Sequence, residues 1–321
     1  MPGSSYALVS EVISGTNTVD DIVWTSSAPS VAEVSSGTVT AISDGTAVIT
    51  ASIGNCSATC SVTVKTPPSV IVKNYVADGV NYGPGINIGG TVWAPVNCGY
   101  EPANGDYKGY PYGKLYQWGR KYGHGYSGSL YDTCEGILNV IGEVSDADTP
   151  ELAVGPVSLS EGQSEDNAEK FYCVSDGSYD WLDTQNDGLW NAGSVAVPVK
   201  TDYDPCPTGW RVPTLSELEA LSEKNHSSWT TNGEGQSGYY FVGEYTYMED
   251  VPKVFFPAAG FRECEGSANV RGWWGLYWSS DTYSDPDDDT KACCLWISNG
   301  SCVLNTYWSR AHGFPVRCVQ E

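Results

Sequence analysis

The C-terminal stretch Gly275–Cys318, GLYWSSDTYSDPDDDTKACCLWISNGSCVLNTYWSRAHGFPVRC, combines two kinds of residue. Its apolar residues fall in short runs near strand spacing, separated by Gly, Ser, Asn and Pro turns, which predicts a strand-and-turn scaffold. The other residues are polar or aromatic, and such a scaffold does not need them. We interpret them as a solvent-facing set, because binding loops favour Tyr, Asp, Ser and Asn. An ordinary polar loop surface would have a similar composition.

The residues of this set are our candidate ligand contacts. Tyr and Trp would supply most of the contact area, and the small polar residues would supply hydrogen bonds. The acidic run on its own is also what a solvated loop would contain. The candidates are Tyr283, Asp285, Asp287, Asp288, Asp289, Cys293, Trp296, Asn299, Leu304, Asn305, Tyr307 and His312.

The composition bounds the class of protein. A chain of 321 residues predicts two or three domains. Its 36 glycines and two methionines favour strands and turns over helices. A net charge of -23 repels phosphate backbones and argues against nucleic-acid binding. No apolar run is long enough to cross a bilayer, so we expect no membrane span.

The eleven cysteines point to an oxidising compartment. They do not follow a zinc-binding pattern, and most are therefore expected in disulfides. The odd count leaves at least one unpaired or intermolecular. We expect an extracellular or cell-surface protein, with a phage virion as the alternative.

Residues 1–66 carry short strand-like segments separated by turns, which predicts an antiparallel sandwich. The run VWTSSAPSVAEVSSGTVTAISDGTAVITA at 23–51, followed by CSVTV at 60–64, resembles the group 2 bacterial immunoglobulin-like domain. Members of that family are spacers and stalks on cell-surface and phage-tail proteins. Residues 67–91 are a linker and entry segment, and two prolines stiffen the linker at its start.

One helix is expected to begin at Thr214. Thr214 and Glu217 have capping-box spacing, in which each side chain accepts from the other residue's amide. Leu215, Leu218 and Leu221 would share one face and dock the helix on a core.

The segment 92–321 contains a second ordered set of motifs. It resembles the Fibrobacter-type major paralogous domain, a C-type-lectin-like family common in gut Bacteroidetes. The resemblance implies an α+β domain in which N- and C-terminal strands pair and long irregular loops are held at a few points. The whole chain is then mainly β with some α, an Ig-like β-sandwich followed by a lectin-like domain. The motifs are WAPVNCG at 93–99, YGKLYQWGR at 112–120, DWLDTQNDGLW at 180–190, DPCPTGWRVPTLSELEAL at 204–221, FPAAGFR at 256–262, GLYWSS at 275–280 and HGFPVRCV at 312–319.

Two disulfides are candidates within this domain. Cys206 precedes the expected helix and Cys318 lies in the closing strand. If they pair, the loop exceeds 100 residues, and chain entropy gives about 4–5 kcal/mol of stabilisation. Cys98 with Cys134 is the second candidate, although connectivity cannot be deduced from sequence.

A subset of this fold comprises the variable proteins of diversity-generating retroelements. In those proteins a C-terminal stretch is rewritten at adenine positions, which yields Tyr, Asp, Ser, Cys and His but not Trp or Lys. The polar set between 283 and 312 is similar; Trp296 and Trp308 lie among it, and Trp278 precedes it. An ordinary family member with a polar loop is the alternative.

No catalytic motif is present. The three histidines fit no triad, and neither GxSxG nor HExxH occurs. We therefore expect no enzyme activity, no cofactor and no metal. Asp183, Asn186 and Asp187 could hold calcium through their oxygens, but such a run also fits a turn that caps its own backbone.

The sequence favours a surface-displayed binding protein whose partner is a protein or glycan on a cell surface. The second hypothesis is a pilus or stalk subunit whose polar face is merely solvated. A glycan hydrolase comes third, because no paired carboxylates stand in a recognisable context.

Overall fold

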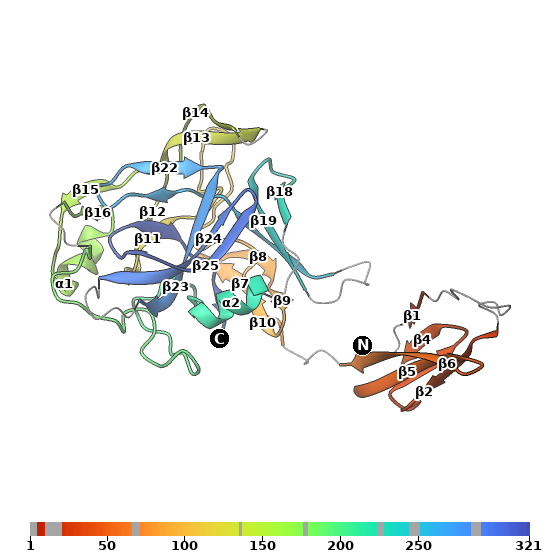
Figure 1. Cartoon of the computed structure of the whole chain (residues 1–321). Coiled ribbons are helices and arrows are strands. Elements are labelled where there is room, and N and C mark those ends of the chain that lie inside the picture. Colours follow the sequence, from red (N-terminus) through yellow and green to blue (C-terminus); the bar gives the residue numbers. More distant parts are fainter. Residues whose placement is uncertain are drawn as a thin grey trace. The chain divides into compact units, whose positions relative to one another are not determined.

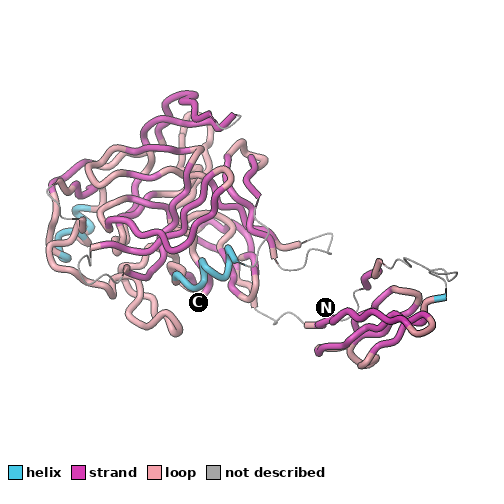
Figure 2. Tube along the Cα trace, in the orientation of Figure 1, coloured by secondary structure: helices cyan, strands magenta, loops and turns pink. Residues whose placement is uncertain are grey.

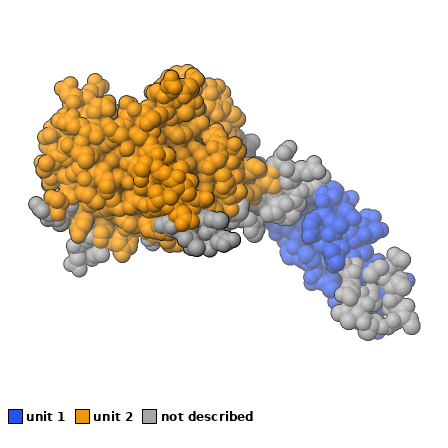
Figure 3. Space-filling model, turned by 90° about the horizontal axis from the view of Figure 1, so that it is seen from above, with its two compact units in different colours: residues 1–69 blue, residues 70–321 orange. Residues whose placement is uncertain are grey.

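The computed structural model describes residues 5–9, 21–65, 71–134, 137–175, 179–223, 228–243, 251–283 and 290–321. The chain forms two compact units, Met1–Ser69 and Val70–Glu321 (Figures 1 and 3). Strands dominate and the helices are short, which confirms the expected mainly-β fold class (Figure 2).

The described part of the first unit forms two three-stranded sheets. One contains β1 (Ser5–Ala7), β4 (Thr38–Ala41) and β3 (Ala32–Ser35), and the other contains β2 (Val23–Ser26), β5 (Gly45–Ile53) and β6 (Cys56–Val64). Val39 and Ala41 of one sheet and Ala47 and Ile49 of the other are buried in one core. This alternation follows from the two-residue side-chain period of a strand.

In its described residues, the second unit contains six sheets and two short α-helices. The seven-stranded sheet has the order β12-β11-β26-β21-β22-β13-β14, and a four-stranded sheet has the order β17-β27-β10-β9. Three-stranded sheets β23-β24-β25 and β18-β19-β20 and the pairs β15-β16 and β7-β8 complete it. The elements are β7 (Asn74–Ala77), β8 (Val80–Pro84), β9 (Ile86–Ile88), β10 (Thr91–Trp93), β11 (Leu115–Gln117), β12 (Gly123–His124), β13 (Ser127–Cys134), β14 (Ile137–Ser145), β15 (Glu151–Val154), α1 (Leu159–Gly162), the 3-10 turn η2 (Glu165–Asn167), β16 (Lys170–Cys173), β17 (Trp210–Arg211), α2 (Leu215–Glu223), β18 (Ser228–Thr231), β19 (Ser237–Val242), β20 (Lys253–Pro257), β21 (Phe261–Arg262), β22 (Ala268–Arg271), β23 (Trp274–Thr282), β24 (Lys291–Ser298), β25 (Ser301–Ser309), β26 (Gly313–Pro315) and β27 (Val319–Gln320).

The two ends of this unit meet in one sheet. β10 pairs with β27 through Trp93 and Val319, as the lectin-like resemblance implies. Within the segment 67–91, β7, β8 and β9 belong to the second unit, and Tyr75 is buried in its larger core. The entry part of this segment therefore folds with the second unit.

The sheet β23-β24-β25 lies between two cores. Leu276 and Trp278 of β23 point into the larger core, and the intervening Tyr277 points into the smaller one. Helix α2 covers the smaller core with Leu218 and Leu221, as predicted, whereas Leu215 is half-buried and is not part of that core. Its capping box is present: the Thr214 amide donates to Glu217 at 2.8 Å and the Glu217 amide donates to Thr214 Oγ1 at 3.4 Å.

Buried arginines hold the irregular loops. Arg317 donates to the carbonyls of Ala94 and Phe255 at 2.9 and 2.7 Å and to the Asn97 side chain at 2.8 Å. Arg120 donates to the carbonyls of Gly162 and Lys170. Burial lowers the pKa of both guanidinium groups to about 10, and they remain charged at neutral pH. Arg317 thereby ties the segment after β10 to strand β20, and Arg120 ties the end of α1 to strand β16.

The predicted disulfide Cys206–Cys318 is present, with a Cα–Cα distance of 5.9 Å. The predicted pair Cys98–Cys134 is wrong, because Cys98 is a buried free thiol. The Cys98 amide donates to Val316 O at 2.9 Å, which fixes it beside the C-terminal segment, whereas Cys134 ends β13. The sulfurs of Cys98, Cys206 and Cys318 all lie within 4.8 Å of one another.

We expect the double substitution Cys206→Ala/Cys318→Ala to destabilise the second unit by about 4–5 kcal/mol, because the bridge closes a loop with a sequence separation of 112. Both cysteines are replaced so that Cys98 cannot pair with a remaining partner. Urea unfolding followed by tryptophan fluorescence measures the change. Cys56→Ala/Cys60→Ala, which removes two exposed free thiols of the first unit, is the control. A loss below about 1 kcal/mol would contradict the expectation.

Candidate functional site

The predicted contact residues lie on or beside the sheet β23-β24-β25. β24 is its central strand and β25 is an edge strand. Cys293 pairs with Tyr307 and Trp296 pairs with Val303, with a bulge between the two pairs. This register decides which predicted residues share a face.

Two predicted residues meet at the surface. The rings of Tyr283 and Tyr307 stack with centroids 3.8 Å apart and an interplanar angle of 17°. The Tyr307 side chain is 43% exposed, and the Lys291 Nζ lies 5.2 Å from its ring centroid. The Tyr283 amide donates to Lys291 O at 3.1 Å, so all three residues are held together. We call Tyr283, Lys291 and Tyr307 the Tyr283–Tyr307 patch.

Two other predicted contacts are buried, and the expectation that they point outward is wrong. Cys293 is 4% exposed, because β24 is a central strand between the two cores. The Sγ of Cys293 lies 3.7 Å from Thr282 O. Burial raises the pKa of Cys293 to about 11, so the thiol is not ionised at neutral pH. His312 is 8% exposed. Its Nε2 lies 3.1 Å from Glu263 Oε2 and its Nδ1 lies 3.2 Å from Ser309 O.

The remaining candidates are dispersed. Trp296 is half-buried on the opposite face of β24 from Cys293, with its ring edge-on to Trp274 at 5.4 Å. Leu304 packs against the smaller core, and Asn299 is exposed in the turn at the far end of β24. Asp285, Asp287, Asp288 and Asp289 lie outside the described residues, as does the side chain of Asn305. The described candidates therefore meet at one small patch rather than across a broad face.

Lys291 was not among the predicted contacts. Its type is outside the set of residues that adenine rewriting yields, so composition gave no reason to choose it. No signal in the sequence could have found it, because its place beside Tyr307 depends on the pairing of β24 with β25, which sets Lys291 opposite Ser309.

The possible calcium turn has a structural use. The Asp187 carboxylate accepts from Arg310 Nη2 at 2.6 Å and from Gln185 Nε2 at 3.0 Å, and Asn186 Oδ1 accepts from the Gly188 amide at 3.0 Å. Asp183 is exposed. The turn thus holds Arg310, the residue that follows β25. Within the described residues, the only group of three or more potential metal ligands is Cys98, Cys206 and Cys318, two of which form the disulfide.

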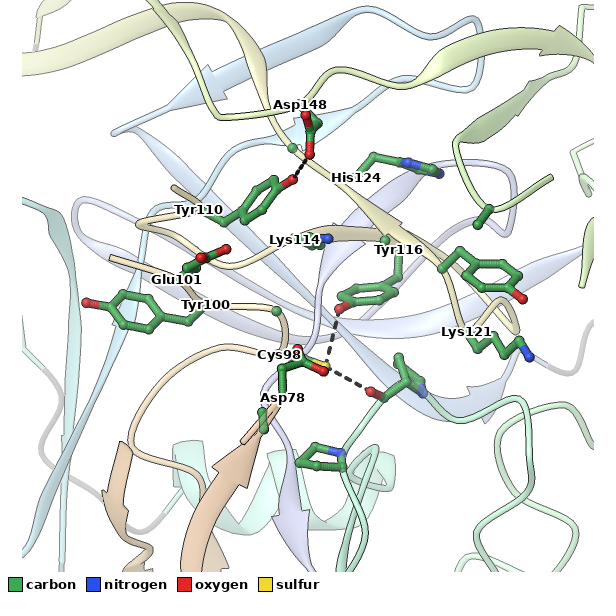
Figure 4. A pocket seen from close by; sticks show the side chains of 18 of the residues that line it. Asp78, Cys98, Tyr100, Glu101, Tyr110, Lys114, Tyr116, Lys121, His124 and Asp148 are labelled. Atoms are coloured by element: carbon green, nitrogen blue, oxygen red, sulfur yellow. Dashed lines mark hydrogen bonds between the residues drawn. The ribbon is translucent and has the colours of Figure 1, made fainter. Parts of the chain in front are cut away.

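A separate cavity of about 460 Å³ opens in the second unit (Figure 4). It lies between the segments 75–82, 98–125 and 148–150, and none of its lining residues belongs to β23, β24 or β25. Buried Cys98 lies at its inner end, where it accepts from Tyr116 Oη at 3.3 Å. Sequence reasoning missed this cavity, although the density of tyrosines between 100 and 122 was visible.

The comparisons with known proteins identify the first unit. The bacterial Ig-like domain family matches residues 20–66, which agrees with the two packed sheets found there. No curated protein and no solved structure matches the chain. In the described residues, every helix is too short or too polar to cross a lipid bilayer.

The distinction between patch and scaffold gives a stability test. We expect Tyr307→Ala to cost about 1 kcal/mol or less, because it removes one exposed ring and its stacking contact. Cys294→Tyr should cost about 3 kcal/mol, because Cys294 is 0% exposed and the core has no room for a ring. Urea unfolding measures both. Equal losses at the two positions would show that the patch is part of the scaffold.

Proposed function

We propose that the second unit is a non-enzymatic, C-type-lectin-like binding head, displayed outside the cell together with the Ig-like unit. The Tyr283–Tyr307 patch is its contact surface for a protein or glycan on another cell. The single observation that carries the proposal is the Tyr283–Tyr307 stack beside Lys291, in which Tyr307 is exposed and Tyr283 is half-buried, at the end of a sheet whose other described side chains are largely buried.

The patch has the residue types that are typical of the centre of a protein interface. Two stacked aromatic rings provide contact area, and their side chains lose little conformational entropy on binding because each ring already restrains the other. The Lys291 ammonium adds a hydrogen-bond donor and a positive charge on a chain of net charge -23. Tyr and Trp dominate the binding energy of measured interfaces.

The surroundings of the patch support tolerance to sequence change. Ala292 and Cys294 alternate with Lys291 and Cys293 along β24 and are fully buried in the larger core, together with Trp278. The scaffold therefore depends on the buried residues, and Tyr283 and Tyr307 can be exchanged at small cost. This agrees with the resemblance to variable proteins of diversity-generating retroelements, which we propose for residues 275–318.

A binding experiment tests the contact surface. We expect the fluorescently labelled full chain to bind intact gut bacterial cells and Tyr283→Ala/Tyr307→Ala to bind at least tenfold more weakly, because hot-spot aromatics each contribute about 2 kcal/mol or more. Flow cytometry measures the binding curve.

The matched control for this experiment is Tyr107→Ala. Tyr107 has the same exposed fraction as Tyr307, 43%, but lies outside the sheet β23-β24-β25. The control should bind like the natural chain. Unchanged binding by the double variant, or no binding by the natural chain, would overturn the proposed contact surface.

The gene locus tests the proposed diversification. We expect a reverse transcriptase gene nearby and a near-copy of the coding stretch for residues 275–318 that differs at adenines. Sequencing the region in several isolates provides the measurement. Identical stretches in all isolates, with no near-copy, would contradict diversification and leave the binding proposal to the cell experiment.

The second candidate function is structural, as a subunit of a pilus or stalk. β25 is an edge strand of its sheet, and edge strands can add a strand from a neighbouring molecule. A protein with this function would form filaments or defined oligomers, which light scattering after size-exclusion chromatography detects. A monomer at micromolar concentration would count against it.

A further inference from the structure

Strand β6 is an unprotected edge strand of the first unit. It belongs to the sheet β2-β5-β6 (Figure 1), and within the described residues no strand pairs with its outer edge. Its ladder with β5 runs through nine consecutive pairs without a bulge. Its sequence, CSATCSVTV, contains neither proline nor a charged residue, which are the usual means of keeping an edge strand from pairing with another chain. The outer edge of β6 can therefore accept a further strand.

The first six residues of β6 are exposed on both faces of the sheet. A strand that covers a core buries every second side chain, as Val62 and Val64 do at the end of β6. The segment Cys56–Ser61 shows no such alternation, since each of its residues is exposed. This part of the β5–β6 hairpin extends past the core of the first unit, so a neighbouring molecule can reach it.

Two free thiols lie on one face of this exposed segment. Cys56 and Cys60 are exposed, whereas the other described free cysteines are buried or half-buried. Because they are four residues apart in one strand, they share a face and their Cα atoms are about 13 Å apart. A disulfide requires Cα atoms within about 7 Å, so the two cysteines of one chain cannot bridge while β6 is intact. Each of them needs a partner outside β6.

The spacing of the two cysteines matches a second copy of the same strand. In an antiparallel pair of β6 strands with a two-fold axis at Ala58, Cys56 of each copy lies opposite Cys60 of the other. Ser57 then lies opposite Thr59. Opposite residues of such a pair have Cα atoms about 4.5–5.5 Å apart, which is within the range that disulfides span. One register therefore aligns all four thiols in two pairs.

The charge of the chain favours this sheet as the place of contact. A net charge of -23 makes two copies repel each other over most of their surfaces. The strands β2, β5 and β6 contain no charged residue, so two copies can approach here without that repulsion. A contact along one strand is smaller than a stable protein interface of about 1,000 Å², so it needs covalent bridges to persist.

We propose that β6 is a self-association site, at which two copies of the chain pair antiparallel and form two disulfides between Cys56 of one copy and Cys60 of the other. A small-molecule disulfide is the oxidant. For each bridge, two thiols lose two protons and two electrons to it, and two small thiols are released. On the proposed function, the covalent dimer carries two binding heads, which strengthens attachment to a surface that bears many copies of a partner.

Complementation between single-cysteine variants tests the site and its register. Full chains at micromolar concentration are incubated with oxidised glutathione and analysed by non-reducing gel electrophoresis. We expect the natural chain to form a covalent dimer and Cys56→Ser and Cys60→Ser each to stay monomeric, because the remaining cysteine lies opposite a serine. An equal mixture of the two variants should give at least about tenfold more dimer than either alone, because strand pairing brings the aligned thiols to a millimolar effective concentration.

Two further variants test the strand pairing itself. Ala58→Lys keeps both thiols but sets like charges opposite each other at the two-fold axis, so it should abolish the dimer. The matched control Ser35→Lys adds the same charge at an exposed position of β3, an edge strand of the other sheet, and should dimerise like the natural chain. Peptide mapping of the natural dimer should yield the pair Cys56–Cys60. Equal urea midpoints under reducing conditions establish that the variants are folded.

Three outcomes would overturn the proposal. The first is no covalent dimer of the natural chain. The second is as much dimer from each single-cysteine variant alone as from their mixture, which would indicate unspecific oxidation. The third is unchanged dimerisation of Ala58→Lys.

The outcome is independent of the proposals for the second unit. The self-association site shares no residue with the Tyr283–Tyr307 patch, so its failure leaves the contact surface to the cell-binding experiment. The variant Cys56→Ser/Cys60→Ser lacks the covalent dimer. Any defined oligomer or filament that this variant still forms therefore reports on the structural subunit.

Discussion

The fold of the second unit depends on giving every buried loop carbonyl a hydrogen-bond partner. Its strands are short, and long segments between them have no ladder to supply such partners. Arg317 and Arg120 connect such segments to neighbouring elements. Arg317 donates to Ala94 O, after β10, and to Phe255 O in β20, and Arg120 donates to Gly162 O in α1 and to Lys170 O in β16. Arg271 forms a two-bond pair with Asp146 at 2.6 and 2.9 Å and fixes another segment. Because an unpaired buried guanidinium is costly, these residues require their loops to stay in place.

This constraint also explains how a surface patch can be separate from the scaffold. Arg310 follows β25 and is held by Asp187 at 2.6 Å and by the carbonyl of Lys291 at 3.2 Å. The end of β25 is therefore fixed by a residue outside the exposed set. Tyr307 can then be positioned without contributing much to the stability of the strand that carries it.

Sequence reasoning reached the capping box at Thr214 from residue types at a fixed spacing. The pairing of the terminal strands was implied by the lectin-like resemblance, and the Cys206–Cys318 bridge was the first of two candidate pairs. Sequence reasoning failed for Cys293 and His312, because their residue types resemble those of an exposed set and burial depends on which sheet faces are covered. A strand with cores on both sides has no outward face in its middle. Neither the bulge in β25 nor the approach of Glu263 to His312 has a sequence signature.

The placement of Cys98 beside the bridge has a consequence for handling the protein. Three sulfurs in mutual reach form three possible bridges, and each leaves one thiol, so the three isomers have the same mass and the same number of titratable thiols. A refolded sample with an incorrect bridge would pass an intact-mass measurement and a thiol count. Peptide mapping after alkylation at low pH, where thiolate exchange is slow, distinguishes the isomers.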